Sequence, residues 1–72
     1  ISGTFIPLLN MFESLEKDIA HLETLKAGLL EKMNSGAYTP AELEQISRNY
    51  GIAEAEIEEK TNRWLTLATL FE

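Results

Sequence analysis

The sequence has no cysteine, a single histidine, two prolines and four glycines among its 72 residues. The absence of cysteine excludes disulfides, thiolate zinc sites and cysteine nucleophiles. Basic side chains are also scarce, because six Lys and Arg stand against twelve Asp and Glu and leave a formal net charge of -6. We do not expect so acidic a chain to bind phosphate backbones over its whole surface.

Long apolar runs are missing as well. No stretch approaches the roughly 20 apolar residues that a membrane-spanning helix needs, so we expect no membrane partner. The chain starts at Ile1 without a basic leader, which does not indicate a signal peptide. The absence of an initial Met leads us to expect a piece of a longer protein, and the length allows one small domain at most.

Two apolar stripes, each advancing in alternating steps of three and four residues, carry most of the information. This alternation is typical of a left-handed coiled-coil seam and predicts two long helices. The first stripe consists of Phe5, Leu8, Phe12, Leu15, Ile19, Leu22, Lys26, Leu29 and Met33, and the second of Leu43, Ile46, Tyr50, Ala53, Ile57, Lys60, Trp64, Leu67 and Phe71. The predicted structural core is Phe12, Leu15, Ile19, Leu22, Leu29, Leu43, Ile46, Ile57, Trp64 and Leu67.

Capping residues set the helix ends. Thr4 is a candidate N-cap for the first helix, with Pro7 in its first turn. Gly36 suits the left-handed conformation that follows a helix. The segment Thr39-Pro40-Ala41-Glu42 is a capping box with proline at the first helical position, and it opens the second helix.

The predicted fold is therefore all-α: an antiparallel two-helix coiled-coil hairpin. We place the helices at about residues 5–34 and 40–71, with a turn at 35–39, and the short turn requires antiparallel helices. In domain terms, residues 1–10 are a linker or helix-start segment and 11–72 are the hairpin. A break near Gly51 is an alternative that would make three helices.

A turn centred near Ala37 also predicts which residues face each other. Phe12 would lie near Trp64, so that aromatic residues gather at the end that carries both termini. Lys26 would face Arg48 and Lys60 would face Ser14, with both lysines extending to solvent. Four leucines beside the stripes widen the apolar surface: Leu9, Leu25, Leu30 and Leu65. We expect a marginally stable hairpin that pairs with a second copy or docks on a parent domain.

Reactive groups are few. Asp18 and His21 lie one helical turn apart, but a carboxylate-bridged metal site needs two such motifs and further carboxylates. His21 is therefore interpreted as a surface residue, and no phosphate-binding loop is present. We predict no catalytic residue, no metal and no cofactor in this segment. The acidic residues Glu54, Glu56, Glu58 and Glu59 are interpreted as a solvated face, the alternative being a contact with a cation-rich docking partner.

The residues nearest the turn form the one candidate contact site. Lys26, Lys32 and Arg48 could contact phosphates there, the alternative being ordinary salt bridges. Asn34 completes this predicted tip together with Tyr38, whose ring could stack on a base or cover the end of the seam.

Three segments of the sequence resemble a known family. Ile19-Ala20-His21-Leu22-Glu23, the Asn-Ser-Gly turn and Glu58-Glu59-Lys60-Thr61-Asn62-Arg63-Trp64-Leu65 are similar to the C-terminal helical hairpin of ABC-F class ATP-binding cassette proteins. The resemblance covers about residues 11–72 and is most specific in the Arg-Trp-Leu end.

The resemblance implies a cytoplasmic parent with two ATPase cassettes, which would hold ATP and magnesium themselves. It also implies a non-catalytic accessory role, with the parent ATPase domains as partners and contacts to the ribosome, ribosomal RNA or DNA. The alternative is a homodimerisation module, two hairpins forming a four-helix bundle without a nucleic-acid role.

Overall fold

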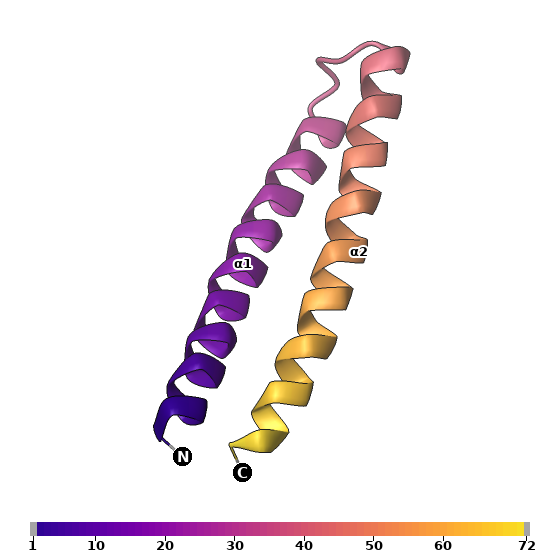
Figure 1. Cartoon of the computed structure of the whole chain (residues 1–72). Helices are drawn as coiled ribbons and strands as arrows, with labels where there is room; N and C mark the ends of the chain where they lie inside the picture. Colours follow the sequence, from indigo (N-terminus) through magenta and orange to yellow (C-terminus); the bar gives the residue numbers. More distant parts are fainter. Residues whose placement is uncertain (1, 72) are drawn as a thin grey trace.

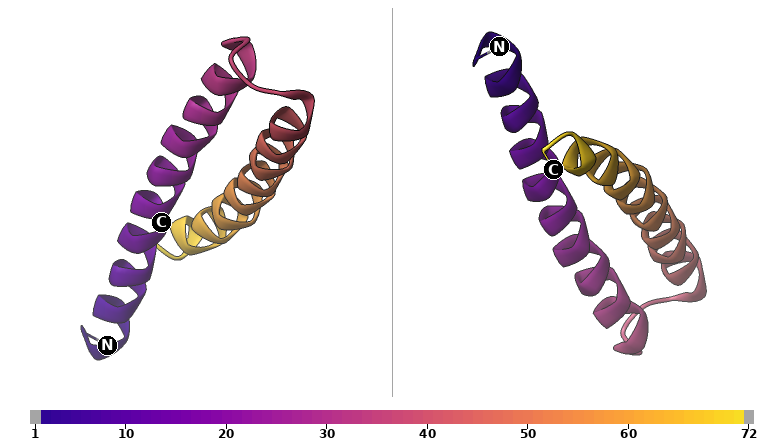
Figure 2. Two further views of the ribbon diagram at one scale, coloured as in Figure 1. Left: turned by 90° about the horizontal axis from the view of Figure 1, so that it is seen from above. Right: turned by 90° about the horizontal axis from the view of Figure 1, so that it is seen from below.

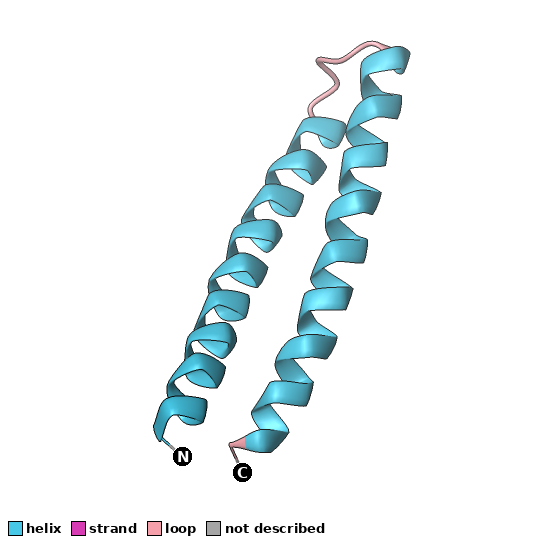
Figure 3. Cartoon of the chain, viewed as in Figure 1, coloured by secondary structure: helices cyan, strands magenta, loops and turns pink. Residues whose placement is uncertain are grey.

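A computed structural model of the chain describes residues 2–71, with side chains described from residue 6 onward. It contains helix α1 (Ser2–Asn34) and helix α2 (Pro40–Leu70), which run antiparallel and pack along their length (Figure 1). No strand occurs in the described range (Figure 3). The predicted all-α helical hairpin is confirmed, and it forms a rod of 55 × 16 × 14 Å. Figure 2 shows the two helices inclined to each other, as packed helices generally are.

The start of α1 differs from the prediction. The helix begins at Ser2, so Thr4 lies within it and is not the N-cap, and Pro7 lies beyond the first turn. Pro7 removes one backbone N–H donor, but the helix continues on its N-terminal side, so proline here interrupts the hydrogen-bond ladder without ending it. The side chain of Phe5 lies outside the described residues, and the role of residues 1–10 as a linker stays a prediction.

The turn follows the sequence closely. Gly36 has a φ of 73°, the left-handed conformation predicted for it. Ser35 stabilises the end of α1, because both its backbone N–H and its hydroxyl donate to the carbonyl of Lys32, at 3.2 and 2.8 Å. The hydroxyl oxygen also accepts from the N–H of Ala37 at 3.2 Å.

The capping box of α2 is confirmed. The N–H of Glu42 donates to Thr39 Oγ1 at 3.2 Å, and the N–H of Thr39 donates to Glu42 Oε1 at 3.0 Å. The alternative of a break near Gly51 is wrong, because α2 is one continuous helix through that position. A single glycine lowers helix stability by only about 1 kcal/mol, which packing along α1 outweighs.

The core lies along the line where the helices meet. Every stripe residue from Leu8 to Phe71 is buried or half-buried. The five buried residues are Leu15, Leu29, Ile46, Ala53 and Leu67. Of the leucines expected to widen the seam, Leu9 is half-buried, whereas Leu25, Leu30 and Leu65 are exposed. A pair of helices covers only one side of each stripe, so about half of the surface of each of these three leucines stays exposed.

The predicted pairing is right for the aromatic pair and wrong for the lysines. Phe12 and Trp64 stack with ring centroids 5.2 Å apart. Lys26 does not face Arg48, because its Nζ lies 3.6 Å from Glu54 Oε2. Lys60 does not face Ser14, because its Nζ lies 3.4 Å from Asp18 Oδ2. Each lysine side chain extends past the predicted neighbour and pairs with a carboxylate on the opposite helix. The ion pair is a favourable contact that the lysine would not have if it extended into bulk solvent.

Candidate functional site

The hairpin exposes two opposite faces, and the seam residues divide between them. Alternate seam positions of a heptad point to opposite sides of the helix pair. We name one side the mixed face; its grooves are lined by the seam residues Leu15, Leu22, Leu29, Ala53, Lys60 and Leu67. We name the other the acidic face; its grooves are lined by the seam residues Ile19, Lys26, Tyr50, Ile57 and Trp64.

The mixed face carries a groove of about 770 Å³ near the open end of the hairpin. Met11, Leu15 and Leu67 supply its apolar lining. Farther toward the turn, a groove of about 200 Å³ lies between Leu25 and Ile52. These apolar sections are separated by charged side chains, so the face alternates between apolar and polar along the rod.

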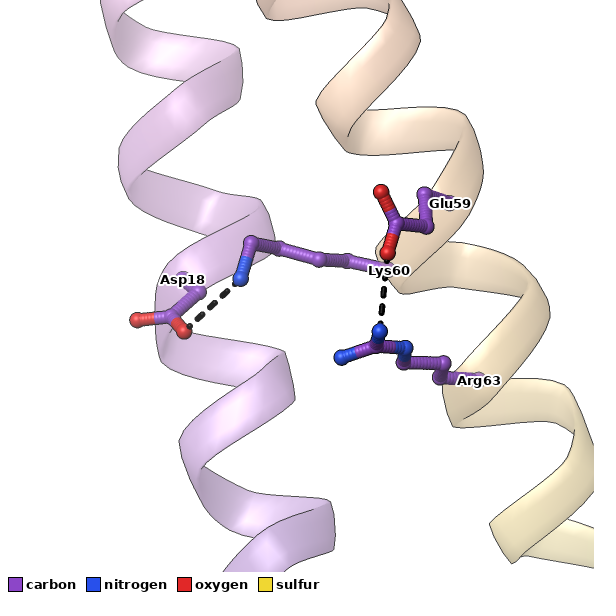
Figure 4. A network of polar contacts seen from close by, with 4 residues as sticks. All are labelled: Asp18, Glu59, Lys60 and Arg63. Carbon is purple, nitrogen blue, oxygen red and sulfur yellow. Dashed lines mark hydrogen bonds and ion pairs between the residues drawn. The ribbon is translucent and has the colours of Figure 1, made fainter.

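Most charges on the mixed face are paired, with Glu56 as the exception among the residues that line its grooves. Lys60 reaches across from α2 to Asp18 of α1, and Arg63 Nη2 lies 2.8 Å from Glu59 Oε1 within α2 (Figure 4). Both cations therefore have a carboxylate partner. Exposed pairs of this kind contribute little to stability, typically less than about 1 kcal/mol, but they leave the face nearly neutral at this point.

The acidic face carries two adjoining grooves of about 320 and 310 Å³, which share Glu23 as a lining residue. Glu16 lines the groove nearer the open end and Leu30 the one nearer the turn. Neither Glu16 nor Glu23 has an ion-pair partner within residues 2–71. The balance of charge on this side is therefore negative.

One cation does occupy the acidic face. The Nζ of Lys26 lies 5.3 Å from the centre of the Tyr50 ring and 3.6 Å from Glu54 Oε2. An ammonium over an aromatic face and beside a carboxylate gains a cation–π contact as well as an ion pair. This explains why a lysine is tolerated in the middle of an otherwise apolar stripe.

The predicted tip residues are brought together only in part. Lys32 and Asn34 are exposed in the last turn of α1, and Tyr38 is half-buried in the connecting turn. Arg48 Nη2 lies 2.7 Å from Glu44 Oε1, and Lys26 is held by Glu54. Two of the three predicted cations thus already have carboxylate partners.

Two features of the site were missed by reading the sequence. The aromatic seam residues share one side of the hairpin, a placement that the heptad positions of Tyr50 and Trp64 already implied. The indole N–H of Trp64 is buried and has no acceptor among the described residues, and nothing in the sequence pattern indicates it.

Groups suited to catalysis are sparse in the described part of the chain. No cluster of three or more His, Cys, Asp or Glu that could hold a metal occurs between residues 2 and 71, and His21 is exposed. The four glutamates from Glu54 to Glu59 are exposed along α2. Within the same range, neither helix is apolar enough over a sufficient length to cross a bilayer.

Comparison with known proteins assigns the family. No match was found among curated proteins or among solved structures. A family model described as the ABC transporter C-terminal domain matches residues 9–69, which include most of both helices and the whole turn. The chain therefore belongs to the ABC transporter C-terminal domain family, accessory C-terminal domains of ABC-type proteins.

Proposed function

We propose that this domain is a non-catalytic coiled-coil arm of a soluble, cytoplasmic ABC-F type ATPase, and that its tip contacts ribosomal RNA, DNA or a protein. Family membership supports an accessory role beside ATPase domains. ATP and magnesium belong to those domains in this proposal, because the hairpin offers no phosphate-binding loop.

The observation that carries the proposal is the shape of the molecule. Both ends of the described chain lie at one end of a rod 55 Å long, and the turn lies at the other (Figure 1). Such a hairpin, attached to a parent protein through one end, holds its turn far from the attachment point. The stacked rings of Phe12 and Trp64 stiffen the attached end.

Lys32 is the cation best placed to act at the tip. It is exposed one turn before Gly36 and has no ion-pair partner in the described range. Exposed Asn34 lies beside it, and the two side chains supply a positive charge and an amide donor. The charges of Lys26 and Arg48 are already offset by Glu54 and Glu44, so these residues contribute less.

The test compares Lys32→Glu with Lys17→Glu, which makes the same charge change at an exposed lysine nearer the open end. The probes are a labelled DNA duplex and a labelled RNA hairpin, titrated at several salt concentrations. A tip contact predicts weaker binding and a shallower salt dependence for Lys32→Glu only. Equal effects of the two variants would show that net charge, and not the tip, governs binding.

Homodimerisation is a second candidate, and the mixed face favours it. Met11, Leu25 and Ile52 are 55%, 49% and 57% exposed there, and of the charged residues that line its grooves only Glu56 lacks an ion-pair partner among the described residues. Sedimentation over a range of concentrations tests this. Dimerisation through the mixed face predicts that Ile52→Gln weakens the dimer, whereas Leu65→Gln, a change to a similarly exposed residue outside the grooves, does not.

A further inference from the structure

We propose that the acidic face is a docking site for a cationic amphipathic α-helix of a partner protein. The site consists of the two adjoining grooves that share Glu23, and it is separate from the tip and from the mixed face. The partner helix would lie along the groove between α1 and α2, with its apolar side on the seam and its Lys or Arg side chains against the glutamates of α1.

The floor of the acidic face has the composition of a protein interface. All five buried core residues belong to the other set of seam positions, whereas Phe12, Tyr50 and Trp64 on this side are only half-buried. Half-buried aromatic rings leave apolar area that a partner can cover, and aromatic residues dominate the energetics of protein–protein contacts. The described aromatic residues of the helices therefore lie where an additional helix would gain most from burial.

The walls of the grooves let a helix approach closely. Ala20 and Ala27 line the α1 side, and Thr61 lines the α2 side. Small side chains at these positions allow the backbone of a third helix to settle between α1 and α2 at ordinary packing distances, about 8–10 Å between axes.

The charge of the acidic face identifies the partner as cationic. Glu16 and Glu23 are seven residues apart in α1, so their carboxylates lie on the same side of the helix at a spacing of about 10 Å. Both lack an ion-pair partner among the residues that the structure describes. A partner helix with Lys or Arg at the same seven-residue spacing would pair with both, while a nucleic acid would be repelled.

The chain itself shows how a cation is held on this face. Lys26 lies over the Tyr50 ring and beside Glu54, with 32% of its side chain exposed. A partner cation near Glu16 or Glu23 would have a comparable environment, a carboxylate next to the aromatic floor that includes Trp64. The same chemistry, repeated along the groove, would hold the helix in one register.

The probe for the test is a synthetic helical peptide of three heptads, with Leu and Ala on one side and Arg flanking them at seven-residue spacing. Its binding to the 72-residue chain is measured by calorimetry and by the emission of Trp64, the single tryptophan, which lines the groove. The proposal predicts that Glu16→Lys/Glu23→Lys weakens binding at least about tenfold and abolishes the change in emission.

The matched control is Glu31→Lys/Glu58→Lys, which makes the same charge change at exposed glutamates that line neither groove of the acidic face. Less than about threefold weakening is expected for this pair. Because all four glutamates are exposed, the variants should keep the helical circular dichroism of the parent chain. A peptide with Glu in place of Arg should not bind.

Three outcomes would overturn the proposal. One is the absence of peptide binding at physiological salt. Another is equal weakening by both double variants, which would indicate attraction to net charge alone. The third is self-association of the free chain that changes Trp64 emission and is lost in Glu16→Lys/Glu23→Lys, because a second copy would then be the occupant of this face.

Discussion

The indole ring of Trp64 lies against the phenyl ring of Phe12, with centroids 5.2 Å apart and an interplanar angle of 24°. Phe71 meets the same phenyl ring edge-on at 5.5 Å and 75°. These residues come from opposite ends of the chain, so their contact joins the helices farthest from the turn. Helix pairs fray most easily at their open end, and the aromatic cluster stabilises that end.

Replacing Trp64 should reveal how much this cluster contributes. Trp64→Ala should lower the free energy of unfolding by about 3 kcal/mol, because it removes both the stack and a large half-buried surface. Trp64→Phe should cost less than about 1 kcal/mol, because it keeps a stacking ring and removes the buried N–H that has no acceptor among the described residues. Urea denaturation measures both values.

The control for the tryptophan variants is Leu65→Ala, at a neighbouring residue that is 51% exposed. It should change the free energy of unfolding by about 0.5 kcal/mol or less. If Trp64→Phe were as costly as Trp64→Ala, the stacking contact would not be the source of stability.

The two glycines at Gly36 and Gly51 should respond to alanine in opposite directions. Gly36→Ala should destabilise the protein by about 1 kcal/mol, because the φ of 73° is strained for a residue with a Cβ. Gly51→Ala should stabilise it by up to about 1 kcal/mol, because a Cβ there meets nothing within 4 Å and alanine favours the helix. Thermal melts of the two variants against the parent chain measure this, and a shift of both in the same direction would contradict the assignment.

The capping box should make stability depend on pH. Hydrogen bonds from the backbone N–H of Thr39 and from its side chain hold the pKa of Glu42 below its ordinary value. A carboxyl group whose pKa is lowered on folding contributes stability that is fully present above its unfolded pKa. That stability is lost as the pH falls through the lowered folded pKa.

Carboxyl titration by NMR should place the Glu42 pKa below that of exposed Glu31. In Glu42→Gln, the part of the acid-induced loss of stability that comes from this residue should disappear, since glutamine does not titrate. A Glu42 pKa equal to that of Glu31 would show that the capping box does not persist in solution.

Lys60 should be replaceable by an apolar residue without loss of stability. Its side chain is 27% exposed at a seam position, and its pair with Asp18 is exposed to solvent. Lys60→Leu should raise the free energy of unfolding by about 1 kcal/mol, because leucine extends the seam and Asp18, 52% exposed, remains solvated. Arg63→Leu, at an exposed position on the same helix, is the control and should have an effect within about 0.5 kcal/mol.

Urea denaturation at low and high salt distinguishes the two contributions of Lys60. A stabilising Lys60→Leu variant should also lose some salt dependence, because the ion pair is gone. Strong destabilisation would contradict this prediction, because it would mean that the Lys60–Asp18 contact contributes more stability than the burial of a leucine.

The alternating stripes, the capping box at Thr39 and the glycine at Gly36 were enough to predict two helices, their order and the turn between them. These features act through local backbone geometry and side-chain periodicity, which neighbouring residues control. The start of α1 was misjudged because Pro7 is tolerated inside a helix when adjacent turns support it, and no local pattern reveals that support.

Tertiary structure alone decided which charges meet across the two helices. The sequence places Lys26 and Lys60 on the helices, but their carboxylate partners depend on how far one helix is displaced along the other and on the reach of long side chains. Arg48 differs, because its partner Glu44 lies one turn away in the same helix. The same packing places the unpaired Glu16 and Glu23 on one face and the ion pairs of Lys60 and Arg63 on the other. Periodicity determined that this chain would form a hairpin, because the burial of each stripe depends only on the spacing of its residues. The packed pair of helices determined which surface is left for a partner, because that surface depends on distances between residues far apart in the chain.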